Sequence, residues 1–322
     1  MKKTISILLI ALILVGTLTA CGNNGTATDD TLSVVTTIFP EYDWVMNILG
    51  DRADSCDVTM LLDKGVDLHS YQPTADDIIR ISTCDIFIYV GGESDEWVED
   101  ALKETVNKDM RVINLLDVLG EAAKAEELKD GMEAEEEEEE EGEAEYDEHV
   151  WLSLKNAVTL VEAICNAITD ADAENAEEYS ANAAAYVEKL KALDGKYETA
   201  VGNAPVKTLL FVDRFPFRYM TDDYGLDYFA AFLGCSAESE ASFETVAFLA
   251  DKVDELKLSC VLTLEGSDGK IAETVVASTE SKSAKILSVN SMQSVTAEDV
   301  KNGASYLTIM EKNLDVLTEA LR

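Results

Sequence analysis

The sequence predicts an α/β protein with two parallel-sheet lobes, and three patterns support this prediction. Short apolar stretches alternate with amphipathic helical patterns between residues 32 and 118, and the same alternation returns between residues 208 and 289. Such alternation favours parallel sheets, because each helix carries the chain back to the start of the next strand. Between the two regions lies a single helical pattern of roughly 30 residues, which we expect to join the lobes.

The first alternating region contains four expected strands, at residues 32–37, 56–62, 85–90 and 111–118. The helical patterns between them fall at residues 41–49, 76–83 and 97–106. The stretch 85–90 is a continuous apolar run after Asp85, which is typical of a strand that is buried on both faces of a sheet.

The joining helix is expected at residues 173–201, where apolar side chains recur at steps of three and four. The segment Gly202-Asn203-Ala204-Pro205 should end it. The second alternating region then has expected strands at residues 208–212, 228–232, 260–264 and 286–289, and helices at residues 217–224, 242–256, 268–278 and 299–321.

The N-terminus has the features of a secretion signal. Lys2 and Lys3 precede an apolar stretch at residues 5–15 that is too short to span a membrane. Residues 18–21 resemble a bacterial lipobox, in which Cys21 becomes the lipid-modified first residue after cleavage. An ordinary signal peptide with an incidental cysteine is the alternative. We therefore expect a protein anchored by lipid to the outer face of the bacterial cytoplasmic membrane, without a transmembrane helix elsewhere.

Composition excludes one class of partner. The 322 residues carry a formal net charge of −39, which repels nucleic acid and attracts cations. The length is sufficient for two domains, and we expect a monomer.

The five cysteines after Cys21 show no Cys-x-x-Cys spacing, which argues against a thiolate metal cluster. Cys235 and Cys260 are compatible with a disulfide, and the odd total leaves at least one free thiol.

Only two histidines occur, and both stand in similar contexts. His69 follows an apolar strand and precedes a helical pattern, so it should lie at the carboxyl edge of a sheet, where ligands bind in α/β proteins. His149 follows the acidic Asp147 and Glu148 and precedes another helical pattern. Imidazole and nearby acidic groups favour a bound metal cation. The pattern contains no His-Glu-x-x-His pair, so surface or structural roles stay open as alternatives.

Four stretches, at residues 35–40, 67–74, 85–89 and 148–152, resemble in order and spacing the zinc/manganese substrate-binding proteins of bacterial ABC importers. The resemblance implies two α/β lobes joined by a single long helix, with a metal site in the cleft between the lobes. It also implies that His69 and His149 are metal ligands and that an ABC transporter permease is the partner.

Together, these observations divide the chain into seven segments. They are a signal peptide (1–20), a lipid-anchored tether (21–31), an N-terminal α/β lobe (32–120), an acidic disordered loop (121–148), the end of the N-terminal lobe (149–172), a linking helix (173–204) and a C-terminal α/β lobe (205–322). The acidic loop includes an unbroken glutamate run, Glu135–Glu141, where relatives often carry a histidine-rich loop. A cation-collecting role and a plain solvated linker are both compatible with this run.

The C-terminal lobe departs from the family pattern. By the resemblance, the third ligand position falls on Arg214, whose guanidinium has no lone pair for a metal, and the fourth falls near Asn290. Asp213 and Glu265 each stand at the end of an expected strand, and we expect these carboxylates to complete the metal site. Salt bridges to Arg214 or Arg218 are the alternative role for them.

The sequence thus predicts a receptor that captures a divalent metal for an ABC permease, without catalysis. Two histidines with carboxylates suit Zn2+, with Mn2+ or iron as alternatives. A surface adhesin or metal sensor is a second interpretation. A zinc metallohydrolase is a third, which is less favoured because no general base stands beside either histidine.

Overall fold

The computed structural model describes residues 31–133, 145–236 and 240–322. The expected signal peptide, Cys21 and most of the tether lie outside the described residues, and so does the glutamate run Glu135–Glu141. Within the described part of the chain, no helix is both long and apolar enough to cross a membrane.

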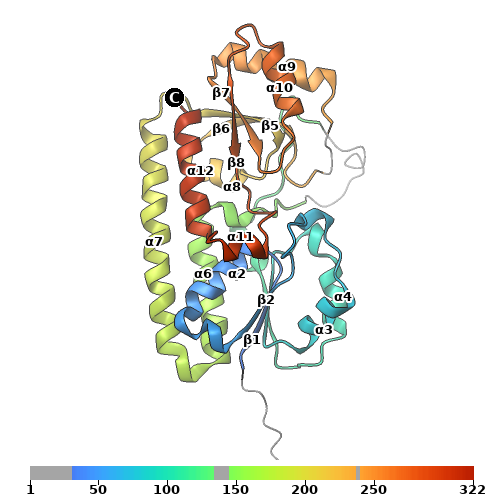
Figure 1. Ribbon diagram of the computed structural model, residues 1–322, viewed down its shortest axis with the longest axis vertical. Helices are drawn as coiled ribbons and strands as arrows, with labels where there is room; N and C mark the ends of the chain where they lie inside the picture. The colour runs from blue at the N-terminus through green and yellow to red at the C-terminus, as the bar shows by residue number, and fades with distance from the viewer. Residues whose placement is uncertain (1–30, 134–144, 237–239) are drawn as a thin grey trace, which may run out of the picture. The chain divides into compact units, whose positions relative to one another are not determined.

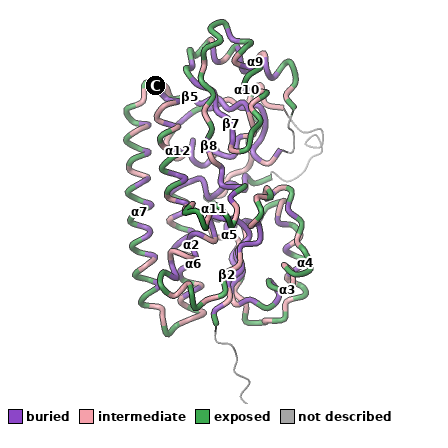
Figure 2. Tube along the Cα trace, viewed as in Figure 1, coloured by how far each residue is buried: buried purple, intermediate pink, exposed green. Residues whose placement is uncertain are grey.

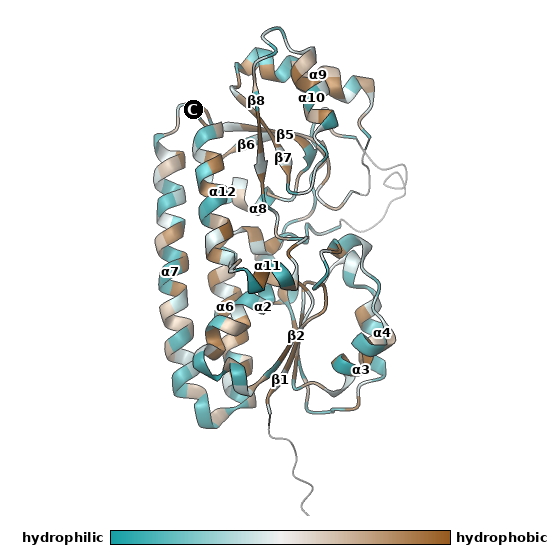
Figure 3. Cartoon of the chain, viewed as in Figure 1, coloured by the Kyte–Doolittle hydropathy of each residue, from teal (hydrophilic) through white to brown (hydrophobic). Residues whose placement is uncertain are grey.

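The N-terminal lobe is built on a four-stranded parallel sheet with strand order β2-β1-β3-β4 (Figure 1). Its strands are β1 (Ser33–Thr36), β2 (Asp57–Met60), β3 (Ile86–Tyr89) and β4 (Arg111–Asn114). Its helices are α2 (Phe39–Leu49), α3 (Ala75–Thr83), α4 (Trp97–Lys103) and α5 (Leu115–Leu119). The central strands β1 and β3 are largely buried, and β3 is apolar, as the pattern at residues 85–90 predicts (Figures 2 and 3).

The fourth strand is shorter than the sequence predicts. It ends at Asn114, because the Asn114 side chain accepts a hydrogen bond from the Asp117 backbone N–H at 3.1 Å and so caps α5. The apolar residues that follow, which suggested a longer strand, form the buried face of that helix instead.

The C-terminal lobe repeats the arrangement with strand order β6-β5-β7-β8, again parallel throughout. Its strands are β5 (Thr208–Arg214), β6 (Asp227–Phe232), β7 (Cys260–Leu264) and β8 (Lys285–Val289). Its helices are α8 (Arg218–Tyr224), α9 (Phe243–Leu256) and α10 (Lys270–Ser278). Figure 1 shows α9 and α10 on one face of this sheet, with α12 (Tyr306–Ala320) on the other.

The predicted linking helix is present as α7 (Ala176–Asn203), which follows α6 (Leu154–Ala171). Its 28 residues span about 42 Å. In its N-terminal half, the Tyr186 hydroxyl donates to Asp43 Oδ2 in α2 at 3.0 Å. Toward the other end, the Tyr197 hydroxyl donates to the Met310 carbonyl in α12 at 2.7 Å. The helix therefore holds elements of both halves, and the prediction of two parallel-sheet lobes joined by one long helix is confirmed.

The prediction for the end of the chain is wrong in one respect. Residues 299–321 were expected to form one helix, but α11 (Ala297–Lys301) and α12 are separate. Gly303 adopts a φ of +94°, which residues with a side chain rarely adopt, and Ser305 then caps α12 through Thr308 N–H.

Contacts between the lobes involve large aromatic side chains near the start of α12. The Tyr306 hydroxyl donates to the Trp151 carbonyl at 2.6 Å, and the Trp44 and Tyr306 rings meet edge to face at 5.3 Å. Trp151 Nε1 donates to the Ser291 carbonyl, beyond β8, at 2.8 Å. These buried contacts place the segment around His149 directly against the loop that follows β8.

Candidate metal site

His69 is held by its neighbours in the loop after β2. It lies in a 3₁₀ turn (Leu68–Ser70), and its backbone N–H donates to Asp67 Oδ1 at 3.1 Å. Leu68 is buried and anchors the turn in the core. The Nδ1 atom of His69 lies 2.7 Å from Ser94 Oγ and 3.5 Å from Glu148 Oε2. These contacts fix the ring and direct its Nε2 atom away from them.

His149 is fixed in the same manner and is fully buried. Its backbone N–H donates to Asp147 Oδ1 at 2.8 Å, and its Nδ1 lies 3.0 Å from the same oxygen. The ring lies next to Trp151, with 5.3 Å between the ring centroids. A carboxylate at Nδ1 orients the ring and directs Nε2 toward the other histidine.

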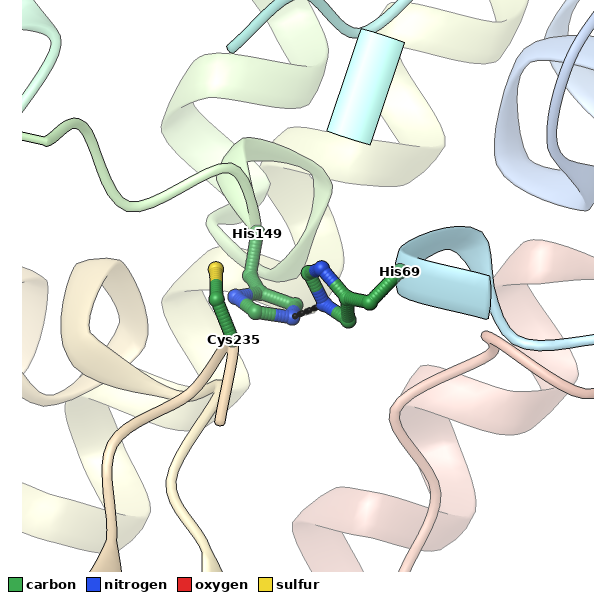
Figure 4. Close-up of side chains that lie close together, drawn as sticks. All are labelled: His69, His149 and Cys235. Carbon is green, nitrogen blue, oxygen red and sulfur yellow. Dashed lines mark hydrogen bonds between the residues drawn. The ribbon is translucent and has the colours of Figure 1, made fainter. Parts of the chain in front are cut away.

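The two Nε2 atoms face each other at 3.2 Å, although the residues lie 80 positions apart in the sequence (Figure 4). Burial, followed by the nearby His149 ring, lowers the pKa of His69 to about 3, so its imidazole is neutral at physiological pH. Metal ligands must be unprotonated, and ligand atoms bound to one zinc ion lie roughly 3.5 Å apart. The pair therefore has the spacing of two ligands of one ion, and His69 has the unprotonated form that a ligand needs.

Cys235 is the third potential ligand at this point. Among the described residues, His69, His149 and Cys235 form a group in which one ligand atom from each lies within 4.8 Å of the others. The thiol belongs to the loop after β6, and Figure 4 shows it beside the His149 ring. Burial and the nearby Glu126 carboxylate raise the pKa of this thiol above its usual range. Cys235 and Cys260 are both free thiols, so the compatible disulfide is not formed.

Asp213 and Glu265 line the same cavity as His69, which has a volume of about 850 Å³. Their oxygens are engaged within the C-terminal lobe. Asp213 accepts from the backbone N–H groups of Arg214 at 2.9 Å and Leu264 at 3.2 Å. Glu265 accepts from the backbone N–H and the hydroxyl of Ser291, both at 2.7 Å. Neither carboxylate joins the group formed by the two histidines and Cys235, and their role as ligands stays a prediction.

Arg214 turns toward the N-terminal lobe. Its Nη2 lies 2.6 Å from Asp67 Oδ2, so an ion pair connects the end of β5 to the turn that carries His69. Arg218 pairs with Glu127 at 3.1 Å. Both arginines therefore pair with carboxylates other than Asp213 and Glu265.

Gln293 also reaches the histidines. In the amide orientation that satisfies its hydrogen bonds, its oxygen lies 2.5 Å from His149 Nε2 and its nitrogen donates to Asp67 at 2.7 and 3.0 Å. Asn290, near which the resemblance puts the fourth ligand, instead accepts from Met292 N–H at 2.8 Å and shapes the turn. The loop after β8 thus presents Gln293, three residues further on, to the site.

Sequence reasoning did not identify Cys235 or Gln293 as side chains of the metal site. A signal for Cys235 was present, because it follows a strand of a parallel sheet, and the carboxyl ends of such strands meet at one edge. Gln293 had a weaker signal, since only the segment and not the side chain could be indicated.

Comparison with known proteins shows the family of this chain. The family model described as ZnuA, zinc-uptake complex component A periplasmic, matches residues 34–320, so the chain belongs to this family. The zinc-binding lipoprotein AdcA of Streptococcus pneumoniae serotype 4 is 34% identical over 98% of this chain and 61% of its own length. The high-affinity zinc uptake system protein ZnuA of Bacillus subtilis is 31% identical over 94% of this chain and 93% of its own length.

A solved structure shares the fold. The Zn(II)-bound ZnuA-like domain of Streptococcus pneumoniae AdcA superimposes with a TM-score of 0.71 and 29% identity, covering 90% of this chain and 99% of that domain. The chain spans 55–61% of the full length of the streptococcal AdcA relatives that it matches. It therefore corresponds to the ZnuA-like part of those longer proteins.

Proposed function

We propose that this protein captures a zinc ion outside the cytoplasm and delivers it to the permease of an ABC importer. The observation that carries the proposal is the pair of Nε2 atoms at 3.2 Å, with each Nδ1 already held by another group. Metal-binding histidines are commonly oriented in this manner by a partner at the second ring nitrogen. The names of the relatives support zinc as the cargo.

The donor set favours zinc over manganese. Imidazole nitrogen suits zinc, whereas Mn2+ prefers carboxylate and water oxygens. At the histidine pair, the groups within reach are nitrogen, sulfur and amide oxygen, while the Asp213 and Glu265 carboxylates bind backbone groups. Manganese would be favoured only if both carboxylates left those contacts.

Capture and release require no chemical step, and we infer no catalytic role for the site. The ion enters a cavity lined by both lobes, at the point where Asp67 and Arg214 already join them. Binding in such a cleft is coupled to small movements of one lobe against the other. Lipid attachment at Cys21 would keep the receptor at the outer face of the cytoplasmic membrane, near its permease.

Competition between metals tests the proposal. Metal-free protein should bind zinc tightly and manganese far more weakly, as measured by competition with a chromophoric chelator. His69→Ala should abolish tight zinc binding, and Arg52→Ala, a surface control in the ion pair with Glu178, should leave it unchanged. Equal affinity for the two metals would refute the assignment of zinc.

A further inference from the structure

The two histidines supply only half of the four ligands that zinc usually has in proteins. The positions that the resemblance offers for the other half do not provide them. Arg214 has no lone pair and is paired with Asp67, and the Asn290 side chain holds the backbone of its own turn. A further donor at this point must come from another part of the C-terminal lobe.

The loop after β6 approaches the histidines closely because of Gly234. A Cβ atom at this position would lie 2.9 Å from the Phe215 carbonyl oxygen and 3.1 Å from the His149 ring, which is closer than side chains normally pack. The next residue, Cys235, donates its backbone N–H to Glu126 Oε1 at 3.1 Å, which fixes the loop in place. Glycine at 234 thus lets the backbone bring the Cys235 thiol to the metal site.

We infer that Cys235 is a third protein ligand of the captured ion, so that the receptor holds zinc by two imidazole nitrogens and one thiolate sulfur. This inference rests on the proposed function and adds a donor to it. One possible ligand atom from each of the three residues already lies within 4.8 Å of the others. A zinc ion with bonds of about 2.0–2.1 Å to nitrogen and about 2.3 Å to sulfur draws them to roughly 3.5 Å. The contraction is of the size that side-chain rotation and slight lobe closure provide.

Coordination converts the thiol to a thiolate. The S–H proton passes to solvent as the sulfur–zinc bond forms, and no oxidant or reductant takes part. The resulting set of donors is softer than two histidines with carboxylates, so it strengthens zinc binding and weakens manganese binding. Zinc should also protect the Cys235 thiol, which is partly exposed, from alkylation.

Cobalt(II) as a spectroscopic substitute for zinc gives the direct test. Cobalt bound to the wild-type protein should show a sulfur-to-metal charge-transfer band in the near ultraviolet. Cys235→Ser should lose this band and weaken zinc binding by more than about tenfold, the lower bound for losing even an outer partner of a metal site. Cys56→Ser is the matched control, because Cys56 is also a partly exposed free thiol, and it should retain the band and the affinity.

Two further variants separate this inference from the carboxylate alternative. Asp213→Asn and Glu265→Gln should change zinc affinity less than Cys235→Ser does. A Cys235→Ser protein with full zinc affinity, or wild-type cobalt protein without the charge-transfer band, would overturn the inference while leaving the histidine site intact. Absence of zinc binding in the wild type would instead refute the proposed function.

Discussion

Asp67 takes part in two contacts that shape the cavity. One carboxylate oxygen accepts from the His69 backbone N–H at 3.1 Å, and the other lies 2.6 Å from Arg214 Nη2. The guanidinium therefore puts a fixed positive charge on the cavity that also receives the cation. Like charges repel, so Arg214 should weaken the binding of any metal ion here.

Replacing this charge with a ligand should strengthen binding. Arg214→His removes the repulsion and restores the donor that the resemblance expects, so zinc affinity should rise by about tenfold or more in chelator competition. Arg52→His is the control, because Arg52 pairs with Glu178 at the surface. Equal or lower zinc affinity in Arg214→His would show that position 214 does not face the ion.

The two histidines should differ in what their loss does to folding. His69→Ala should abolish tight zinc binding with little change in the melting temperature, because the ring lines the cavity and makes mainly polar contacts. His149→Ala should also abolish binding but lower the stability of the metal-free protein by about 1–3 kcal/mol, since it removes a fully buried ring and its contact with the buried Asp147 carboxylate. Calorimetric titration and thermal unfolding measure both effects. Full zinc affinity in both variants would contradict the site.

The sequence was sufficient to predict His69 and His149 as site residues, because rare histidines in matching contexts stand out without knowledge of packing. It was not sufficient to predict that Cys235 and Gln293 lie beside them. Their approach to His149 depends on how the loops after β6 and β8 pack against the segment around Trp151, which no local pattern reports.

At the scale of elements, α2 begins over a buried carboxyl group. Glu41 Oε2 accepts from the backbone N–H groups of Thr37 at 2.8 Å and Ile38 at 3.2 Å, while Oε1 is buried without a hydrogen-bond partner among the described residues. Burial, followed by the negative charge of Asp95, raises the Glu41 pKa to about 8. The folded protein therefore keeps this group protonated at neutral pH.

This group should make stability depend on pH. The folded state binds more protons at Glu41 than the unfolded state between pH 4.5 and about 8, so its stabilising contribution is complete below pH 4.5 and is lost as pH rises through 8. Glu41→Gln imitates the protonated form, so denaturant unfolding should show equal stability to the wild type at low pH and greater stability at pH 8–9. Parallel stability curves for the two proteins would contradict the raised pKa.

The sequence predicted the strands and the long helix well, because period and length identify them. It failed at two element ends. The strand at 111–118 became β4 and α5, since a polar cap at Asn114 outweighed apolar continuity, and the last helix broke at Gly303, where a positive φ interrupts it. Both failures come from single residues that direct the backbone.

The acidic segment, residues 121–148, is anchored at both flanks. Its flanks make specific contacts, since the Glu126 N–H donates to the Glu145 carbonyl at 2.8 Å and the Glu133 N–H donates to the Ala231 carbonyl at 3.0 Å. The run Glu135–Glu141 lies outside the described residues. If it gathers cations, its effect belongs to the long-range field and is screened beyond about 8 Å at physiological salt.

Neutralising the run tests this point. With glutamines at positions 135–141, zinc association measured by stopped flow should slow at low ionic strength, and equilibrium affinity at physiological salt should stay nearly unchanged. Thermal stability of the metal-free protein should be unaffected. Equal association rates for the two proteins at low salt would contradict a cation-collecting role and favour a plain solvated linker.

For the whole molecule, the central claim is that one ion binds both His69 and His149, beside a cavity that is lined by both lobes. A crystal structure of the zinc-loaded protein, with anomalous data at the zinc edge, tests it most directly. The account predicts one ion about 2.0–2.1 Å from the Nε2 atoms of both histidines. An ion bound elsewhere, or bound without either Nε2 atom, would contradict it.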